Sequence, residues 1–304
     1  MSEKKPSLAK IYWILMKPRV VILLQATAIC GVLAYDLREG YNNGRTSLDS
    51  LVTSLIVLLG GSLASGGSMA INMWYERDID PLMERTEKRP IPSGYISPNH
   101  ALAFGTFICA SGIGLVSFLS NKEAGMITAF SALFYIFIYT MFLKRRTPHN
   151  IVIGGLAGST PPAIGWVAAS GQIDSVLPWL MVFTIFMWTP PHFWSLTLSK
   201  RKDYGEAGVP MLPVVRGEDV TRNHITAYTV SLIVTTLLIV IYGGAGIIFL
   251  VTGMALSIYF AYRALSLRTT KSESDAWNLF KFSNFYLYSV FICIVIDSAY
   301  LVNL

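Results

Sequence analysis

Three oxygen-bearing side chains at a regular spacing are the part of this sequence best suited to chemistry. Asn72, Glu76 and Asp80 follow one another at intervals of four residues. If the helix that holds Asn72 continues, this spacing places all three side chains on one helical face. Amide and carboxylate oxygens are ligands that Mg²⁺ prefers, and protein-bound Mg²⁺ commonly joins one or two carboxylates to substrate phosphates. The spacing therefore predicts that these residues are metal ligands and catalytic groups.

Basic side chains follow the carboxylates closely. A metal-bridged diphosphate needs neutralisation by cationic side chains as well as by the metal. We therefore predict a diphosphate site that uses basic residues of this loop and of two later loops, namely Arg77, Arg85, Lys88, Arg89, Lys144, Arg145 and Lys200. The alternative for the first loop is a solvated, salt-bridged helix extension. For Lys144 and Arg145 the alternative is a cluster that only orients the chain in a membrane.

A third group of polar residues surrounds a proline pair. Pro190-Pro191 lies in an apolar stretch, where we expect it to break or kink a helix and to free backbone carbonyls. His192 follows directly, and it could be a haem ligand, a proton donor or a packed polar side chain. Asp203 and Tyr204 come just beyond this stretch, as the first carboxylates do beyond an earlier one. This likeness suggests two polar loops that face one site.

The chain that carries these groups is too apolar to fold in water. Of its 304 residues, 53% are hydrophobic and 14% are charged, whereas a soluble domain carries about 25% charged residues. These figures exclude a disordered chain and a basic nucleic-acid-binding protein. A membrane-spanning helix needs about 20 mostly apolar residues. Nine stretches meet this requirement, at about 20–36, 50–73, 100–119, 124–143, 150–169, 177–198, 224–242, 245–262 and 283–303.

The distribution of basic residues supports this count. With nine spans, 21 of the 24 Lys and Arg residues fall on one face of the membrane, and only Arg38, Arg45 and Lys122 fall on the other. By the positive-inside rule the first face is cytoplasmic, and the N-terminus lies inside. We therefore predict an all-α, multi-pass protein of the cell membrane that forms one domain over residues 1–304. Its cytoplasmic active-site loops are expected at about 74–99 and 199–223.

The carboxylate motif resembles a signature of the UbiA superfamily of intramembrane prenyltransferases. That signature reads Asn-x3-Asp-x3-Asp, and Asn72, Glu76 and Asp80 match it with Glu76 in place of the usual Asp. The replacement keeps the carboxylate and lengthens its reach. Metal ligation by these three residues is thus also what the resemblance implies.

Longer motifs resemble the subfamily that farnesylates haem. They lie, in order along the chain, at Lys17–Val20, Asp78–Pro90, Lys144–Gly158 and Trp188–Pro213. The resemblance extends over about residues 12–220. The superfamily's second Asp-x3-Asp motif is absent, and Lys200, Asp203 and Tyr204 stand in its place.

The resemblance implies a fold and a reaction. The fold is a bundle of nine helices around a central cavity that faces the cytoplasm. The reaction transfers the farnesyl group of farnesyl diphosphate to a vinyl group of haem b with Mg²⁺ as cofactor, and addition of water gives haem O and diphosphate. His192, Asp203 and Tyr204 are then expected on the haem side or in proton handling. Haem O would pass to a terminal oxidase, directly or through haem A synthase.

Other functions remain open at this stage. A UbiA-type enzyme could instead prenylate an aromatic acid in quinone biosynthesis. A secondary transporter would suit broken helices and many spans, but its polar ligands should lie near the bilayer midplane. A purely structural membrane subunit would not explain why carboxylates and cations gather in the loops of one face.

Overall fold

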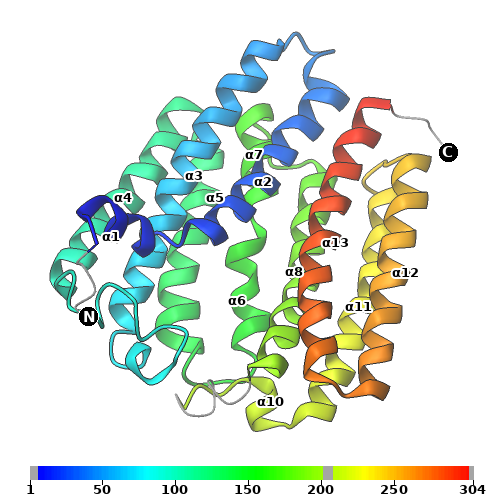
Figure 1. Ribbon diagram of the computed structural model, residues 1–304. Coiled ribbons are helices and arrows are strands. Elements are labelled where there is room, and N and C mark those ends of the chain that lie inside the picture. The colour runs from blue at the N-terminus through cyan, green and yellow to red at the C-terminus, as the bar shows by residue number, and fades with distance from the viewer. Residues whose placement is uncertain (1–5, 201–207, 301–304) are drawn as a thin grey trace.

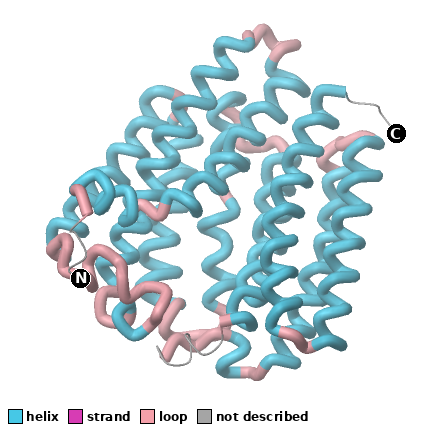
Figure 2. The backbone as a smooth tube through the Cα atoms, in the orientation of Figure 1, coloured by secondary structure: helices cyan, strands magenta, loops and turns pink. Residues whose placement is uncertain are grey.

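The computed structural model describes residues 6–200 and 208–300, and every regular element in these ranges is helical. Long helices run side by side as a bundle (Figure 1), and residues 76–97, which include the 3-10 helix Asp80–Leu82, form a loop at its lower left (Figure 2). The helices are α1 (Leu8–Leu15), α2 (Pro18–Tyr35), α3 (Ser47–Tyr75), α4 (Pro98–Leu119), α5 (Lys122–Leu133), α6 (Asn150–Ser159), α7 (Pro161–Ser170), α8 (Val176–Ser199), α10 (Leu212–Val215), α11 (Glu218–Ile241), α12 (Ile247–Thr270) and α13 (Glu273–Tyr300). Two π-helical segments, Asp36–Gly40 and Phe134–Leu143, continue α2 and α5.

Eight helical segments within the described ranges are long and apolar enough to cross a membrane. They coincide with eight of the nine predicted spans, so the all-α, multi-pass prediction is confirmed. The remaining predicted span, the sixth along the chain at 177–198, is α8. This helix of 24 residues is not among these eight. Its prolines, threonines and histidine make it less apolar than the others. It packs against α6, α11 and α13, so much of its surface faces protein.

The structure corrects the expected break at Pro190-Pro191. Helix α8 is continuous from Val176 to Ser199 and holds both prolines in its interior. Each proline removes one backbone donor, but packing on three neighbouring helices keeps the segment helical. The predicted span at 150–169 is instead divided, because α6 ends at Ser159 and α7 begins at Pro161.

Glycines allow two helix pairs to approach closely. A methyl group at Gly67 of α3 would lie 2.5 Å from the carbonyl oxygen of Gly105 on α4. A methyl group at Gly165 of α7 would collide with the carbonyl oxygen of Ala28 on α2. Such small residues let helix backbones pack directly in a membrane. The first of these contacts fixes α3, which carries Asn72, within the bundle.

Three predicted cytoplasmic regions lie at one end of the bundle. The C-terminal end of α3, the N-terminal end of α6 and the short helix α10 are all at the bottom of Figure 1. The charged residues predicted to act together are therefore brought to the same end, although they are far apart in the sequence.

Candidate active site

The end of α3 places the first carboxylates. The helix ends at Tyr75, and the amide of Glu76 still donates to the carbonyl of Asn72 at 3.0 Å. The chain then forms turns over residues 76–79 and enters a short 3-10 helix, Asp80–Leu82. The amide of Asp80 bonds the carbonyl of Glu76 at 2.9 Å, which keeps the turn tight. The expectation of one continuous helical face is therefore wrong beyond Glu76.

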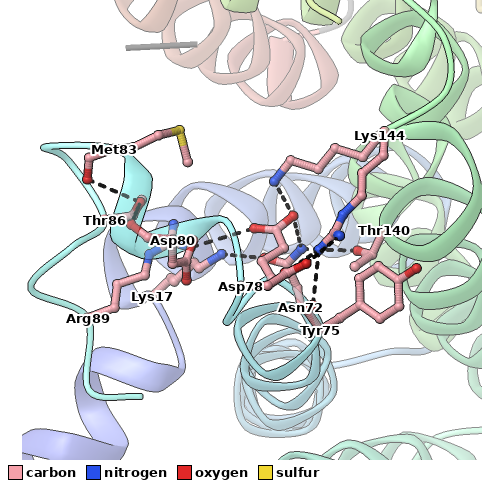
Figure 3. A network of polar contacts seen from close by, with 12 residues as sticks. Lys17, Asn72, Tyr75, Asp78, Asp80, Met83, Thr86, Arg89, Thr140 and Lys144 are labelled. Carbon is pink, nitrogen blue, oxygen red and sulfur yellow. Dashed lines mark hydrogen bonds and ion pairs between the residues drawn. The ribbon is translucent and has the colours of Figure 1, made fainter. Parts of the chain in front are cut away.

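Asn72 is the centre of a buried network at this end. Its amide nitrogen donates to Glu76 Oε1 at 2.9 Å and to Thr140 Oγ1 at 3.2 Å. Its amide oxygen accepts from Lys17 Nζ at 2.7 Å. Figure 3 shows Lys17 and Thr140 reaching Asn72 from opposite sides. Every polar atom of this amide thus has a partner, as burial requires.

The Glu76 carboxylate is held ionised by cations. It is 1% exposed, Lys144 Nζ bonds its Oε1, and Arg89 Nη1 lies 3.6 Å from its Oε2. Burial alone would raise its pKa, but the charges of Lys144, Lys17 and Arg89 outweigh burial and lower the pKa to about 2.

Asp80 differs from Glu76 because one of its oxygens is unsatisfied. Arg89 Nη1 donates to its Oδ1 at 2.7 Å, while its Oδ2 is buried and has no hydrogen-bond partner in the described chain. Burial raises the pKa of Asp80, although Arg89 opposes the change. A buried, unpaired carboxylate oxygen calls for a further positive group.

These residues fit a divalent metal ion. The described residues contain no group of three His, Cys, Asp or Glu side chains that could hold one. A metal ion held by Glu76 and Asp80 would therefore need a further ligand, such as the amide oxygen of Asn72. Both carboxylates face the same Arg89 nitrogen, so they lie near one another. Oxygen ligands of this kind suit Mg²⁺, and the unpaired Asp80 oxygen is one of them.

The predicted diphosphate residues divide into two sets. Arg89 and Lys144 contact the carboxylates directly. Arg145 instead forms a two-point ion pair with Asp78, at 2.6 and 2.8 Å, and lies over the ring of Tyr75. The others turn away or lie at the surface. Arg77 bonds the carbonyl of its own helix at Trp74, and Arg85, Lys88 and Lys200 are exposed.

Sequence reasoning missed two members of the network. Lys17 is part of the Lys17–Val20 motif and of the basic residues on one face, but its type and place directly before Pro18 did not predict a contact with Asn72. Thr140 lies inside an apolar run and carries no sequence signal. It reaches Asn72 because its helix is π-helical over Phe134–Leu143, and such segments are frequent at functional sites.

The turn that carries Lys144 is fixed by backbone contacts. The amide of Lys144 bonds the carbonyl of Tyr139 at 2.9 Å, which closes the π-helical segment. The side-chain nitrogen of Asn150 donates to the carbonyls of Lys144 and Thr147, at 3.4 and 2.7 Å. The backbone of Lys144 is therefore anchored on both sides.

His192 lies in a packed aromatic environment between α8 and α13. Its ring stacks on Trp188 at 4.2 Å, and its Nδ1 lies 2.6 Å from Ser283 Oγ. The Ser283 hydroxyl donates its only proton to the carbonyl of Phe280 at 2.6 Å. In the arrangement in which Ser283 donates to Phe280, Nδ1 carries the ring proton and Nε2 keeps its lone pair. Asp203 and Tyr204 lie outside the described residues.

Comparison with known proteins decides the family. The model of the UbiA prenyltransferase family matches residues 42–289. The chain belongs to the UbiA prenyltransferase family. As a member, it is a multi-pass membrane protein. It is 42% identical to protoheme IX farnesyltransferase of Ruegeria pomeroyi, with 94% of this chain and 89% of that one covered. The same enzyme of Bartonella bacilliformis is 44% identical, with 94% and 90% covered.

Solved UbiA structures share the fold. A digeranylgeranylglyceryl phosphate synthase structure matches with a TM-score of 0.75 at 20% identity, covering 96% of this chain and 99% of the other. A UbiA homologue from Archaeoglobus fulgidus, bound to GPP and Mg²⁺, matches with a TM-score of 0.59 at 16% identity, covering 93% and 99%. At these identities the likeness concerns the fold alone.

Proposed function

We propose that this protein transfers the farnesyl group of farnesyl diphosphate to a vinyl group of haem b. Water adds at the neighbouring carbon, which gives haem O, and diphosphate is released. The observation that carries this proposal is the similarity of 42% and 44%, over most of the chain, to protoheme IX farnesyltransferases. The charges at the end of α3 support it, because the donor substrate is a diphosphate.

Asn72, Glu76 and Asp80 are the proposed ligands of Mg²⁺. When bound, the ion would stabilise the negative charge that develops on the leaving diphosphate. The unpaired Asp80 Oδ2 supports this role, since it lacks a positive partner. The Archaeoglobus fulgidus relative binds GPP together with Mg²⁺, which supports the same pairing of metal and prenyl diphosphate here.

Arg89 and Lys144 are the proposed diphosphate-binding residues nearest to the metal ligands. Breaking the allylic carbon–oxygen bond separates a carbocation from an anion, so cations held beside the leaving group favour the step. Arg89 is well placed because it already touches both carboxylates. We propose the same role, farther from the metal ligands, for the other basic residues of these loops, namely Arg77, Arg85, Lys88, Arg145 and Lys200.

His192 is the proposed residue on the haem side. Its Nδ1 proton is committed to Ser283, so its Nε2 lone pair can bind a metal or accept a proton. Asp203 and Tyr204 are proposed for the same part of the reaction on the basis of the motif alone. We also propose that α8 completes a nine-helix bundle with a cytoplasmic N-terminus.

An aromatic acid is the alternative acceptor, and a transporter the alternative class. In the experiment, the protein is purified in detergent and incubated with farnesyl diphosphate and Mg²⁺. The acceptor added is either haem b or 4-hydroxybenzoate. A farnesylated haem with no prenylated benzoate supports the proposal. Prenylated benzoate with unchanged haem would keep the family and reject the acceptor. Neither product, from folded protein with both acceptors in solution, would favour the transporter.

A further inference from the structure

The oxygens proposed as metal ligands already have cationic partners within the chain. Lys144 Nζ bonds Glu76 Oε1, and Lys17 Nζ bonds the amide oxygen of Asn72 at 2.7 Å. A divalent ion that used these oxygens would lie next to both ammonium groups. Cations so close in a buried site repel strongly, so the lysines and the metal compete for the same oxygens.

Both carboxylates of the site already have a cationic partner before any metal enters. Lys144 and Arg89 pair with the two carboxylates of Glu76 and Asp80. Lys17 has no carboxylate of its own, because its hydrogen bond goes to a neutral amide. A divalent ion entering alone would add positive charge to a site whose carboxylates are already paired, and a displaced Lys17 would still lack a carboxylate partner. Both events are costly away from water.

Both lysines are built so that only their side chains need to move. Lys17 has a φ of +48°, a left-handed conformation that non-glycine residues rarely adopt, directly before Pro18. Its backbone is thus held between α1 and α2 in a conformation that the surrounding structure must maintain. The backbone of Lys144 is anchored by Tyr139 and Asn150. Each side chain is long and flexible enough to change partners from a fixed base.

We propose that Lys17 and Lys144 are resident counter-ions of the metal site, which release Asn72 and Glu76 and bind the diphosphate when metal and diphosphate arrive together. This inference rests on the proposed function and adds Lys17 to the diphosphate-binding residues. It makes metal binding dependent on diphosphate, and, by thermodynamic reciprocity, diphosphate binding dependent on metal.

Equilibrium dialysis of the full-length protein in detergent tests this coupling, with Mn²⁺ and inorganic diphosphate as probes. For the wild type we expect weak retention of either probe alone and joint retention of both, with apparent affinities improved by at least about tenfold. Lys144→Met and Lys17→Met should bind Mn²⁺ alone more tightly than the wild type, because a competing cation is gone. Both should retain diphosphate less well in the presence of Mn²⁺. Lys10→Met, an exposed lysine of α1, is the matched control and should behave as the wild type.

Equal affinity of the wild type for Mn²⁺ with and without diphosphate would overturn the inference, and this measurement needs no variant. The inference would also be overturned if the two lysine variants bound Mn²⁺ alone no better than the wild type. Their unfolding temperatures would show that they are folded. A parallel assay for haem O separates the two proposals. If haem O forms but Mn²⁺ and diphosphate bind independently, only the counter-ion role of the lysines is rejected. If Mn²⁺ and diphosphate bind jointly but no haem O forms, only haem b as the acceptor is rejected.

Discussion

At the scale of single residues, Asp80 is the ligand on which the proposed metal site depends most. We predict that Asp80→Asn lowers haem O formation by at least about 100-fold, since it removes the negative charge that would face the metal. The unfolding temperature should change little, because the amide fits the same space and only the bond to Arg89 is weakened. Glu84→Gln, an exposed acid of the same loop, is the control. Normal turnover in Asp80→Asn would remove this residue from the site.

Glu76 makes a prediction about acid stability. Its pKa is about 2 in the folded protein, below the ordinary value of 4.5, so its ionised form stabilises the fold above pH 4.5. This stabilisation, on the order of 3 kcal/mol, is lost as the pH falls towards 2, since the unfolded chain takes up the proton first. In metal-free protein, the unfolding temperature of the wild type should therefore fall more steeply between pH 6 and 3 than that of Glu76→Gln. Parallel curves would contradict the assigned pKa.

The residue-scale picture was only partly predictable from sequence. Asn72 and Glu76 are one helical turn apart, so their contact follows from local geometry. Asp80 meets Arg89 through a turn that spacing alone did not predict. Lys17 and Thr140 are far from Asn72 in the sequence. Lys17 directly precedes α2, and Thr140 lies in the π-helical segment that continues α5, and both α2 and this segment pack against α3.

At the scale of elements, the approach of α2 and α7 makes a packing prediction. Gly165→Ala places a methyl group against the carbonyl oxygen of Ala28, so the two helices must separate. We expect a loss of about 1–3 kcal/mol, measured as a lower unfolding temperature in detergent. Gly158→Ala in the neighbouring α6 meets nothing within 4 Å and should be neutral or slightly stabilising. Equal stability of the two variants would contradict the close contact.

Apolar length predicted the helices well, because a chain inside lipid must satisfy its backbone within each helix. Local features within them were less predictable. Pro190 and Pro191 were expected to break or kink α8, and the helix is continuous through both prolines, packed on three neighbours. The π-helical segment at Phe134–Leu143 has an ordinary apolar sequence, so neither its π-helical form nor the contact of Thr140 with Asn72 could be predicted.

At the scale of the whole molecule, the proposed nine-helix topology can be tested by labelling. Single cysteines at Lys122 and Lys271, both exposed, are introduced after the three native cysteines are replaced by alanine. We predict that an impermeant maleimide labels Lys122→Cys in intact cells and Lys271→Cys only after lysis. Outside labelling of both positions would mean that α8 does not cross the membrane.

The measurement that tests the central claim most directly follows haem itself. Purified protein is incubated with haem b, farnesyl diphosphate and Mg²⁺, with and without EDTA. The extracted haem is separated by chromatography, and its mass is determined by mass spectrometry. The proposed function predicts a later-eluting haem, heavier by one farnesyl group and one hydroxyl group, that is absent with EDTA. Unchanged haem from folded protein would contradict the proposed reaction, and the same product in EDTA would contradict the role of the metal at Asn72, Glu76 and Asp80.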